Sequence, residues 1–401
     1  EGLVLQRHDH RGQALLSSGL RFTGDDVAYL TSAAGADALA DVAGLALTDR
    51  IADIGTVRAR YGERTRVLVE TTLLRRKAAG KLSGRDDWLF TDEALQQATA
   101  APVAAHRAAR LAGRAVHDVT CSIGTELAAL RESAEALIGS DLDPVRLAMA
   151  AHNLRDVPAL LCRADALAPV TRDAVVLADP ARRSAGRRRF DPRDYTPALD
   201  GLLAVYRDRD LVVKCAPGID FGALAQWGFA GEVEVTSWGG SVREACLWSP
   251  GLTEPGVTRR AVSLDAAEEL TDADPESGDI GPAGRWIVDP DGAVVRAGLV
   301  RQYATRHGLW QLDPEIAYLS GDDLPTGVRG FEVLEQLPYS EKGLRRALAV
   351  WDCGACEILI RGVRVDPDDL RRRLRLRGTT ALSVVLTRLG AGTAAKAVAF
   401  I

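Results

Sequence analysis

The middle of this 401-residue chain alternates short apolar runs with helical segments, and acidic residues follow four of those runs. Strand–helix alternation of this kind favours a parallel sheet with helices on both faces. The acidic residues are Asp118, Asp141, Asp165 and Asp179. The carboxyl ends of parallel strands meet at one edge, which is where open α/β sheets bind ligands. The sequence therefore predicts an α/β fold that gathers four carboxylates at a ligand-binding edge.

The turn after the first run, His117–Leu127, is made largely of small residues and opens a predicted helix. Small side chains let a ligand approach the backbone, and free N–H groups at a helix start attract carboxylate or phosphate. Gly124 is the only glycine in this turn, so the turn alone is equally typical of an ordinary strand–helix connection. Asp141 follows after about 20 residues, the spacing at which nucleotide-binding folds hold ribose hydroxyls. Together these features favour a nucleotide site, in which Asp165 could reach an adenine amino group.

Composition divides the chain further. We predict an N-terminal helical region at 1–113, the α/β sheet at 114–253, an acidic linker at 254–282 and a separate α/β module at 283–401. The linker is inferred from eight acidic residues against two arginines in Glu254–Asp279, together with turn-forming dipeptides. The runs Gly231–Ser237 and Glu244–Trp248 have no long helix between them, so we expect an antiparallel edge there.

Charge, hydropathy and cysteine usage argue against several classes of protein. The net charge of −5 argues against a uniformly basic coat for nucleic acid, and only five of the 50 basic residues are lysine. No apolar run reaches 18 residues and no signal-peptide pattern is present at the start, so we expect a cytoplasmic protein without a membrane partner. Cys353 and Cys356 form a lone C-x-x-C without two further ligands nearby, so no metal is predicted. The chain begins at Glu1 rather than Met, so its natural start is undefined.

Several longer blocks carry a further signal: Thr71–Ala79, Phe90–Thr99, Asp179–Arg183, Arg189–Pro192, Lys214–Asp220, Leu337–Ser340 and Ile360–Asp366. With these blocks the sequence resembles class I S-adenosylmethionine-dependent methyltransferases of the bacterial group with a C-terminal THUMP-like domain. The resemblance covers nearly the whole chain from about Phe22. It implies a Rossmann-like methyltransferase sheet between a helical region and a THUMP-like α/β module, with S-adenosylmethionine as cofactor and RNA as substrate.

The resemblance also implies which residues hold the cofactor. The segment from Asp118 to Glu126 would surround its methionine part, Asp141 its ribose and Asp165 its adenine. Ser122 and Thr125 stand where glycine is commoner in the family, and both are small enough for binding to stay expected. The cofactor candidates are Thr99, Asp118, Thr120, Cys121, Ser122, Gly124, Glu126, Asp141, Leu142, Asp165 and Ala166.

Asp179-Pro180-Ala181-Arg182 resembles the substrate motif of amino-directed methyltransferases, which reads Asn or Asp, Pro, Pro and an aromatic. There the carboxylate and a backbone carbonyl accept hydrogen bonds from the amine, and alignment supplies much of the rate. Here Asp179, Pro180 and Arg182 are the catalytic candidates, and Asp179 could also accept the proton. Stacking on the base would come from the Arg182 guanidinium or from Phe190 or Tyr195. The predicted activity is methylation of a base nitrogen in RNA.

Alternatives remain open from the sequence. Asp-Pro-x-Arg also resembles enzymes that methylate pyrimidine carbon, and these need a cysteine nucleophile, for which Cys215 is the candidate. An apolar core cysteine is the more ordinary interpretation of Cys215. A small-molecule methyltransferase is one rival class, and a non-catalytic RNA-binding protein that kept the fold is another.

Two arginine clusters are candidate phosphate contacts, because arginine matches phosphate geometry. Five arginines lie within Ala181–Arg189, beside the substrate motif, and this location favours contact with RNA. Seven lie within Arg361–Arg377 against three Asp, which is equally typical of a solvated helix face. The RNA-binding candidates are Arg183, Arg187, Arg188, Arg189, Arg371 and Arg372.

Overall fold

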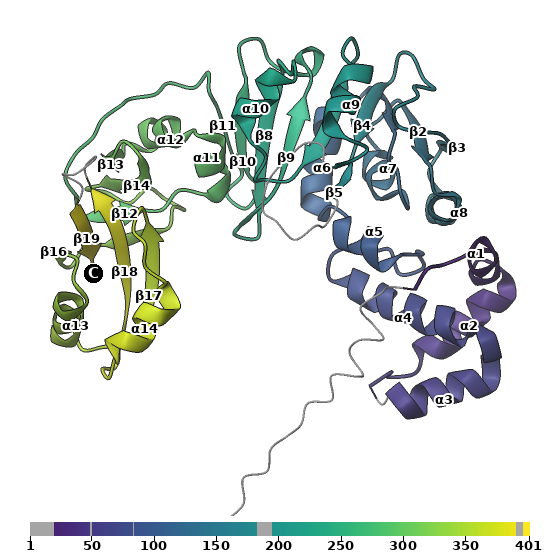
Figure 1. Cartoon of the computed structure of the whole chain (residues 1–401), viewed down its shortest axis with the longest axis horizontal. Helices are drawn as coiled ribbons and strands as arrows, with labels where there is room; N and C mark the ends of the chain where they lie inside the picture. The colour runs from purple at the N-terminus through teal and green to yellow at the C-terminus, as the bar shows by residue number, and fades with distance from the viewer. Residues whose placement is uncertain (1–19, 49, 83, 183–194, 390–395) are drawn as a thin grey trace, which may run out of the picture. The chain divides into compact units, whose positions relative to one another are not determined.

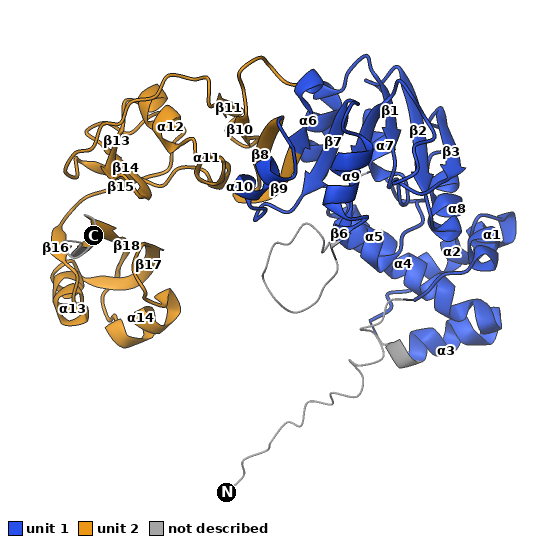
Figure 2. Ribbon diagram, turned by 45° about the horizontal axis from the view of Figure 1, so that its top comes forward, with its two compact units in different colours: residues 1–230, 247–252 blue, residues 231–246, 253–401 orange. Residues whose placement is uncertain are grey.

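The computed structural model describes residues 20–48, 50–82, 84–182, 195–389 and 396–401. The chain divides into two compact units, residues 1–230 with 247–252 and residues 231–246 with 253–401 (Figure 2). The predicted domain limits stay predictions. This division falls elsewhere because the strand at 232–238 pairs with the strand at 259–263, which places both in the second unit.

From residue 20 onward, the described part of the first unit opens with helices (Figure 1). Its first two helices, α1 (Gly24–Leu30) and α2 (Ala33–Ala43), follow each other closely. Ser32 separates them, because its hydroxyl accepts a hydrogen bond from Gly35 N and so caps the second helix. The helices are α1 (Gly24–Leu30), α2 (Ala33–Ala43), α3 (Arg50–Tyr61), α4 (Thr65–Ala79), α5 (Asp92–Gln97) and α6 (Ala101–Arg110).

Basic residues in and just after α4 connect the helical region internally. The Arg75 Nε donates to the carbonyl of Trp88 at 2.9 Å. The Lys81 Nζ donates to the carbonyls of Leu95 and Gln96 at 2.9 and 3.0 Å, at the end of α5. Cations are favoured at helix C-termini, where carbonyl oxygens are unpaired. These contacts fix the end of α5.

A parallel sheet follows in the order β7-β4-β1-β2-β3, which confirms the predicted Rossmann-like core. The chain runs from β1 outward through β2 to β3 and then returns to place β4 on the other side of β1. This reversal is the position at which doubly wound sheets bind ligands. The strands are β1 (Ala115–Asp118), β2 (Ala136–Asp141), β3 (Ala159–Arg163), β4 (Val175–Ala178) and β7 (Leu211–Cys215), and the helices are α7 (Thr125–Leu130), α8 (Pro144–Asn153), α9 (Leu199–Val205) and α10 (Phe221–Gln226).

The second unit starts with strands in the order β11-β10-β8-β9. These are β8 (Glu232–Trp238), β9 (Ser241–Trp248), β10 (Arg259–Ser263) and β11 (Glu268–Thr271). The segment expected as an acidic linker therefore carries two strands. Some of its charges are ion-paired: the buried Arg260 contacts Glu232 and Glu254, both at 2.9 Å, and Arg306 contacts Asp274 at 2.7 Å.

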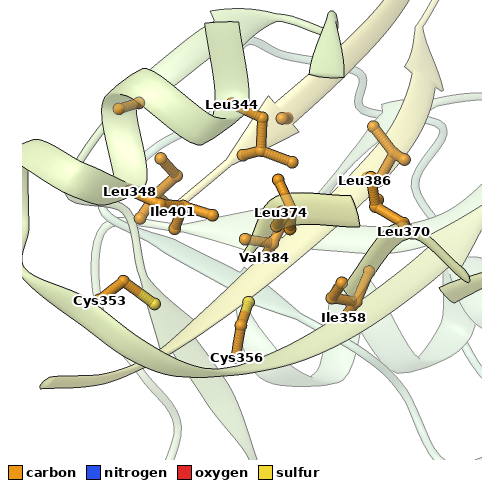
Figure 3. Packing of buried hydrophobic residues seen from close by; sticks show 12 residues of the cluster. Leu344, Leu348, Cys353, Cys356, Ile358, Leu370, Leu374, Val384, Leu386 and Ile401 are labelled. Carbon is orange, nitrogen blue, oxygen red and sulfur yellow. The ribbon is translucent and has the colours of Figure 1, made fainter. Parts of the chain in front are cut away.

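Two further four-stranded sheets complete the second unit, in the orders β13-β14-β12-β15 and β16-β19-β18-β17. Leu344 and Leu348 of α13 and Leu370 and Leu374 of α14 pack against the second of these sheets (Figure 3). Cys353 and Cys356 belong to the same apolar cluster. The elements are β12 (Trp286–Val288), α11 (Gly292–Ala297), α12 (Val300–His307), β13 (Trp310–Asp313), β14 (Ile316–Gly321), β15 (Gly330–Glu332), β16 (Gln336–Pro338), α13 (Glu341–Val350), β17 (Cys353–Arg361), α14 (Pro367–Leu374), β18 (Thr380–Leu389) and β19 (Lys396–Phe400).

Candidate active site

A pocket of about 860 Å³ lies at the carboxyl edge of the first unit's sheet. The structure brings the four strand-end carboxylates together, since Asp118, Asp141, Asp165 and Asp179 all line this pocket. Six further candidates also line it: Thr120, Cys121, Ser122, Glu126, Leu142 and Ala166.

The other candidates are placed differently. Thr99, Gly124 and Pro180 adjoin lining residues in the chain but are not among the residues that line the pocket. Arg182 lies in a short strand, β5 (Ala181–Arg182). The candidates Arg183, Arg187, Arg188 and Arg189, and the stacking candidate Phe190, lie outside the described residues.

The turn after β1 has the backbone that its small residues favour. Gly124 has a φ of 90°, and a Cβ there would lie 2.7 Å from Leu154 Cδ1, so glycine is required by both conformation and space. The N–H of Cys121 donates to the carbonyl of Ser140 at 2.9 Å, which ties the turn to β2. The N–H of Ser122 donates to Asp141 Oδ2 at 3.0 Å. The turn and the end of β2 therefore form one hydrogen-bonded wall.

Asp141 is held at both oxygens. Its Oδ1 accepts from the N–H of Asp143 at 2.9 Å, while its Oδ2 accepts from Ser122. Asp143 itself caps α8 by accepting from the N–H groups of Val145 and Arg146. Backbone donors thus fix the orientation of the Asp141 carboxylate.

Thr120 links the ends of β1 and β4. Its N–H donates to Asp118 Oδ1 at 3.0 Å, and its hydroxyl accepts from the N–H of Asp179 at 2.6 Å. Asp118 is 2% exposed. Burial, followed by the negative charges of Glu126 and Asp179, raises the pKa of Asp118 to about 8. Burial and the neighbouring carboxylates therefore outweigh the nearby positive charge of Lys214 at Asp118.

The pKa of Asp118 predicts a stability that falls with pH. The folded protein holds this proton up to about pH 8, whereas the unfolded chain loses it near the ordinary value of 3.8. Between these values the folded state binds more protons, so its free energy of unfolding falls as pH rises, by at most about 1.4 kcal/mol per pH unit. Thermal unfolding at pH 5 and pH 8 should show a smaller fall in Asp118→Asn than in the wild type. Equal falls in both proteins would contradict the raised pKa.

Glu126, in the first turn of α7, is buried between two cations. Arg107 of α6 contacts its Oε2, and Lys214 Nζ of β7 lies 3.0 Å from its Oε1. Burial opposes its charge, but Arg107 and Lys214, with a smaller contribution from Thr99, lower the pKa of Glu126 to about 2. Lys214 Nζ also lies 2.5 Å from Asp179 Oδ2. Two sequence signals fall on Lys214, its place in the block Lys214–Asp220 and its position within an apolar strand. Neither predicts a site role for it, and Arg107 carries no comparable signal.

Two short paired strands form another wall. β5 pairs antiparallel with β6 (Tyr195–Thr196), which places Tyr195 opposite Arg182. Tyr195 is 4% exposed, and its hydroxyl accepts from the N–H of Ala216 at 3.1 Å. Tyr195 through Ala198 line the pocket together with Ala181. From the sequence, Tyr195 is only one of several stacking candidates, and no apolar run marks the two-residue strand β6.

Cys215 is not placed for nucleophilic attack. It is 6% exposed, ends β7 and is absent from the residues that line the pocket. This burial matches its interpretation as an apolar core cysteine. Among the described residues, no group of three or more His, Cys, Asp or Glu side chains is arranged to hold a metal ion.

The C-terminal arginine candidates are ion-paired. Arg371 contacts Asp368 at 2.6 Å and also donates to the carbonyl of Cys356 at 3.0 Å. Arg372 contacts Asp369 at 3.1 Å. Both carboxylates lie three residues earlier on α14, so each charge is partly compensated within the helix. No helix in the part of the chain that the structure describes is long and apolar enough to cross a membrane.

Comparisons with known proteins agree with this architecture. Residues 328–401 match the family model described as THUMP domain-like. Two Mycobacterium tuberculosis proteins, from strains CDC 1551 and H37Rv, are each named an uncharacterized S-adenosylmethionine-dependent methyltransferase. Each is 65% identical over 353 residues, which span 86% of this chain and 99% of the relative. A crystal structure of a proposed methyltransferase from Porphyromonas gingivalis W83 shares the fold, with a TM-score of 0.75 at 19% identity, over 95% of this chain and 98% of that one.

The parallel sheet carries an acidic pocket at the point where its strand order reverses. Together with these similarities, this arrangement defines a class I methyltransferase. This chain belongs to the S-adenosylmethionine-dependent methyltransferases and carries a THUMP-like domain at its C-terminus. Its cofactor is accordingly S-adenosylmethionine. The pocket suits this cofactor chemically, because carboxylates surround it and the methionine end of the cofactor carries a sulfonium and an ammonium group.

Proposed function

We propose that this chain methylates RNA at a base nitrogen. The observation that carries the proposal is Asp179, whose carboxylate lines the same pocket as Asp118 and Asp141 and is held by Lys214 at 2.5 Å. A carboxylate in this place accepts hydrogen bonds from an amino group and aligns it for attack. The THUMP-like match at residues 328–401 supports RNA as the substrate class.

The cofactor roles follow from the walls of the pocket. Asp141, already oriented by backbone N–H groups, would bind the ribose hydroxyls. Asp165, with Leu142 and Ala166, would meet the adenine. The turn from Asp118 to Glu126 would surround the methionine part of the cofactor. When bound, S-adenosylmethionine supplies a methyl group that is already activated as a sulfonium.

The substrate roles fall on the opposite wall. Asp179 would accept a hydrogen bond from the target amine, and the Pro180 carbonyl is a second candidate acceptor. Tyr195 supports a planar substrate, because its ring is held beside the pocket by the hydrogen bond from Ala216 N. Stacking on an aromatic ring is a common way to hold an unpaired RNA base. Arg182 and the arginines at 183 and 187–189 stay candidates for contact with RNA.

One experiment tests the substrate class. RNA nucleosides and small metabolites from cells with and without the gene are compared by mass spectrometry. We expect a base-methylated nucleoside to disappear without the gene and to return when purified protein and S-adenosylmethionine are added to that RNA. A change confined to small metabolites would instead support a small-molecule methyltransferase. RNA binding without cofactor binding would support the non-catalytic alternative.

Cys215 provides a test against carbon methylation. We expect Cys215→Ala to retain methyl transfer within about threefold, because the thiol is buried and does not line the pocket. RNA containing 5-fluoropyrimidine should form no covalent complex with the wild-type protein. A complex that survives denaturing electrophoresis in the wild type and is lost in Cys215→Ala would favour the pyrimidine-carbon mechanism.

A further inference from the structure

Lys214 has an unusual environment for a lysine of this chain. It is one of only five lysines among 50 basic residues. It lies within β7, whose five residues are all buried, and its own side chain is 7% exposed. A buried lysine needs charged partners, since transfer of an isolated ammonium from water into the protein interior is strongly unfavourable.

Its partners are two carboxylates, one on the proposed cofactor side of the pocket and one on the proposed substrate side. Lys214 Nζ lies 3.0 Å from Glu126 Oε1 and 2.5 Å from Asp179 Oδ2. Glu126 is contacted at its other oxygen by Arg107. Asp179, Lys214, Glu126 and Arg107 therefore form a row of alternating charge. The two carboxylates of the row line the pocket, and the two cations are not among its lining residues.

The choice of lysine matters for this geometry. An ammonium is a compact point charge with three rotatable donors, so it can contact two carboxylates that approach from different directions. A guanidinium is planar and larger, and its donors have a fixed fork geometry. Lys214 contacts Asp179 from behind the pocket wall and so restricts where the carboxylate that faces the pocket can lie.

We propose that Lys214 is a positioning residue that holds Asp179 as a charged hydrogen-bond acceptor and couples it to Glu126 on the cofactor side. The inference rests on the proposed function, in which Asp179 faces the substrate. A carboxylate paired with an ammonium is a poor base, so the matching nucleophile is a neutral nitrogen that attacks with its protons still attached. Its lone pair forms the N–C bond while the C–S bond breaks and leaves its electrons on sulfur. The surplus N–H proton then passes to water.

A double-mutant cycle tests whether Lys214 acts through Asp179. The variants are Lys214→Met, Asp179→Asn and the double mutant, with Lys214→Arg as the conservative change. Methyl transfer to RNA from cells lacking the gene is measured from pH 5 to 9, with kcat separated from KM. We expect kcat to fall about fiftyfold in each single variant and no more than about threefold further in the double mutant, because coupled residues are not additive. Lys214→Arg should recover part of kcat.

The pH profile adds a readout that a purely structural role would not move. Without its ammonium partner Asp179 is more easily protonated, so the acid limb of the kcat profile should shift to higher pH in Lys214→Met. The matched control is Lys77→Met, which removes an exposed lysine 2.6 Å from Asp92 and should change neither kcat nor the profile. An unchanged kcat in Lys214→Met, or effects that add in the double mutant, would overturn the inference.

A second cycle separates this inference from the proposed function. Thermal unfolding is measured for the wild type, Lys214→Met, Asp179→Asn and the double mutant. It reports the coupling between Lys214 and Asp179 without any substrate, and it also shows which variants fold. Coupling in unfolding, together with no RNA methylation by the wild type, would mean that the substrate class is wrong while the positioning pair stands. Absence of coupling in unfolding would reject the pair whatever the substrate.

Discussion

Asp179→Ala is expected to lower methyl transfer to RNA by about a hundredfold or more while leaving cofactor affinity nearly unchanged. Asp179 follows β4 and lines the proposed substrate side of the pocket, whereas the proposed ribose and adenine contacts lie after β2 and β3. Loss of its carboxylate removes the acceptor that aligns the amine and leaves Lys214 with Glu126 as its remaining carboxylate in the row. Initial rates with labelled S-adenosylmethionine measure the first effect, and calorimetry measures the second.

The control for this variant is Asp200→Ala. Asp200 is an exposed aspartate of α9, and it is absent from the residues that line the pocket. Its replacement should leave both the rate and the affinity as in the wild type. Full activity in Asp179→Ala would refute the role given to Asp179, and a parallel loss of cofactor affinity would place this residue on the cofactor side instead.

The strand-end carboxylates could be predicted because their signal is local. Each follows an apolar run, and the strand–helix alternation around β1, β2 and β4 is enough to imply parallel pairing. Parallel pairing then forces Asp118, Asp141 and Asp179 to the same edge of the sheet, with no knowledge of loops or side-chain packing. The observed pocket contains all three, together with Asp165.

The charged row behind the pocket could not be predicted in the same way. Lys214 and Glu126 are 88 residues apart, and Arg107 and Glu126 are 19 apart. A single lysine in an apolar strand, or an arginine in an amphipathic helix, gives no indication of its partner. Such contacts depend on which helix packs on which strand, and that is decided by the whole fold rather than by a sequence window.

The acidic segment after residue 253 shows a different limit of sequence reasoning. A run of carboxylates looks solvated when its partners are unknown, so Glu254–Asp279 predicts a linker. In the structure Arg260 is 4% exposed and contacts Glu232 and Glu254 at once, while β10 pairs with β8. The opposite charges were present in the sequence, but only the pairing of β10 with β8 brings Glu232 into reach.

Asp141→Ala is expected to weaken S-adenosylmethionine binding by about a hundredfold. Two hydrogen bonds from ribose hydroxyls to a charged acceptor contribute about 1.5–3 kcal/mol each, so the loss of the carboxylate corresponds to two or more factors of ten in Kd. The substitution also leaves the N–H groups of Ser122 and Asp143 without their acceptor, which loosens the turn after β1. Isothermal calorimetry with S-adenosylhomocysteine measures the effect without turnover.

Two variants separate ribose binding from the shape of the turn. Asp141→Asn keeps one acceptor oxygen of similar geometry, so it should retain more affinity than Asp141→Ala, yet less than the wild type. Asp143→Ala removes the cap of α8 from a residue that does not line the pocket, so it should cost stability of about 1 kcal/mol with little change in Kd. If Asp143→Ala weakened binding as much as Asp141→Ala, the turn rather than the ribose contact would explain the loss. An Asp141→Ala protein with wild-type affinity would remove Asp141 from the cofactor site.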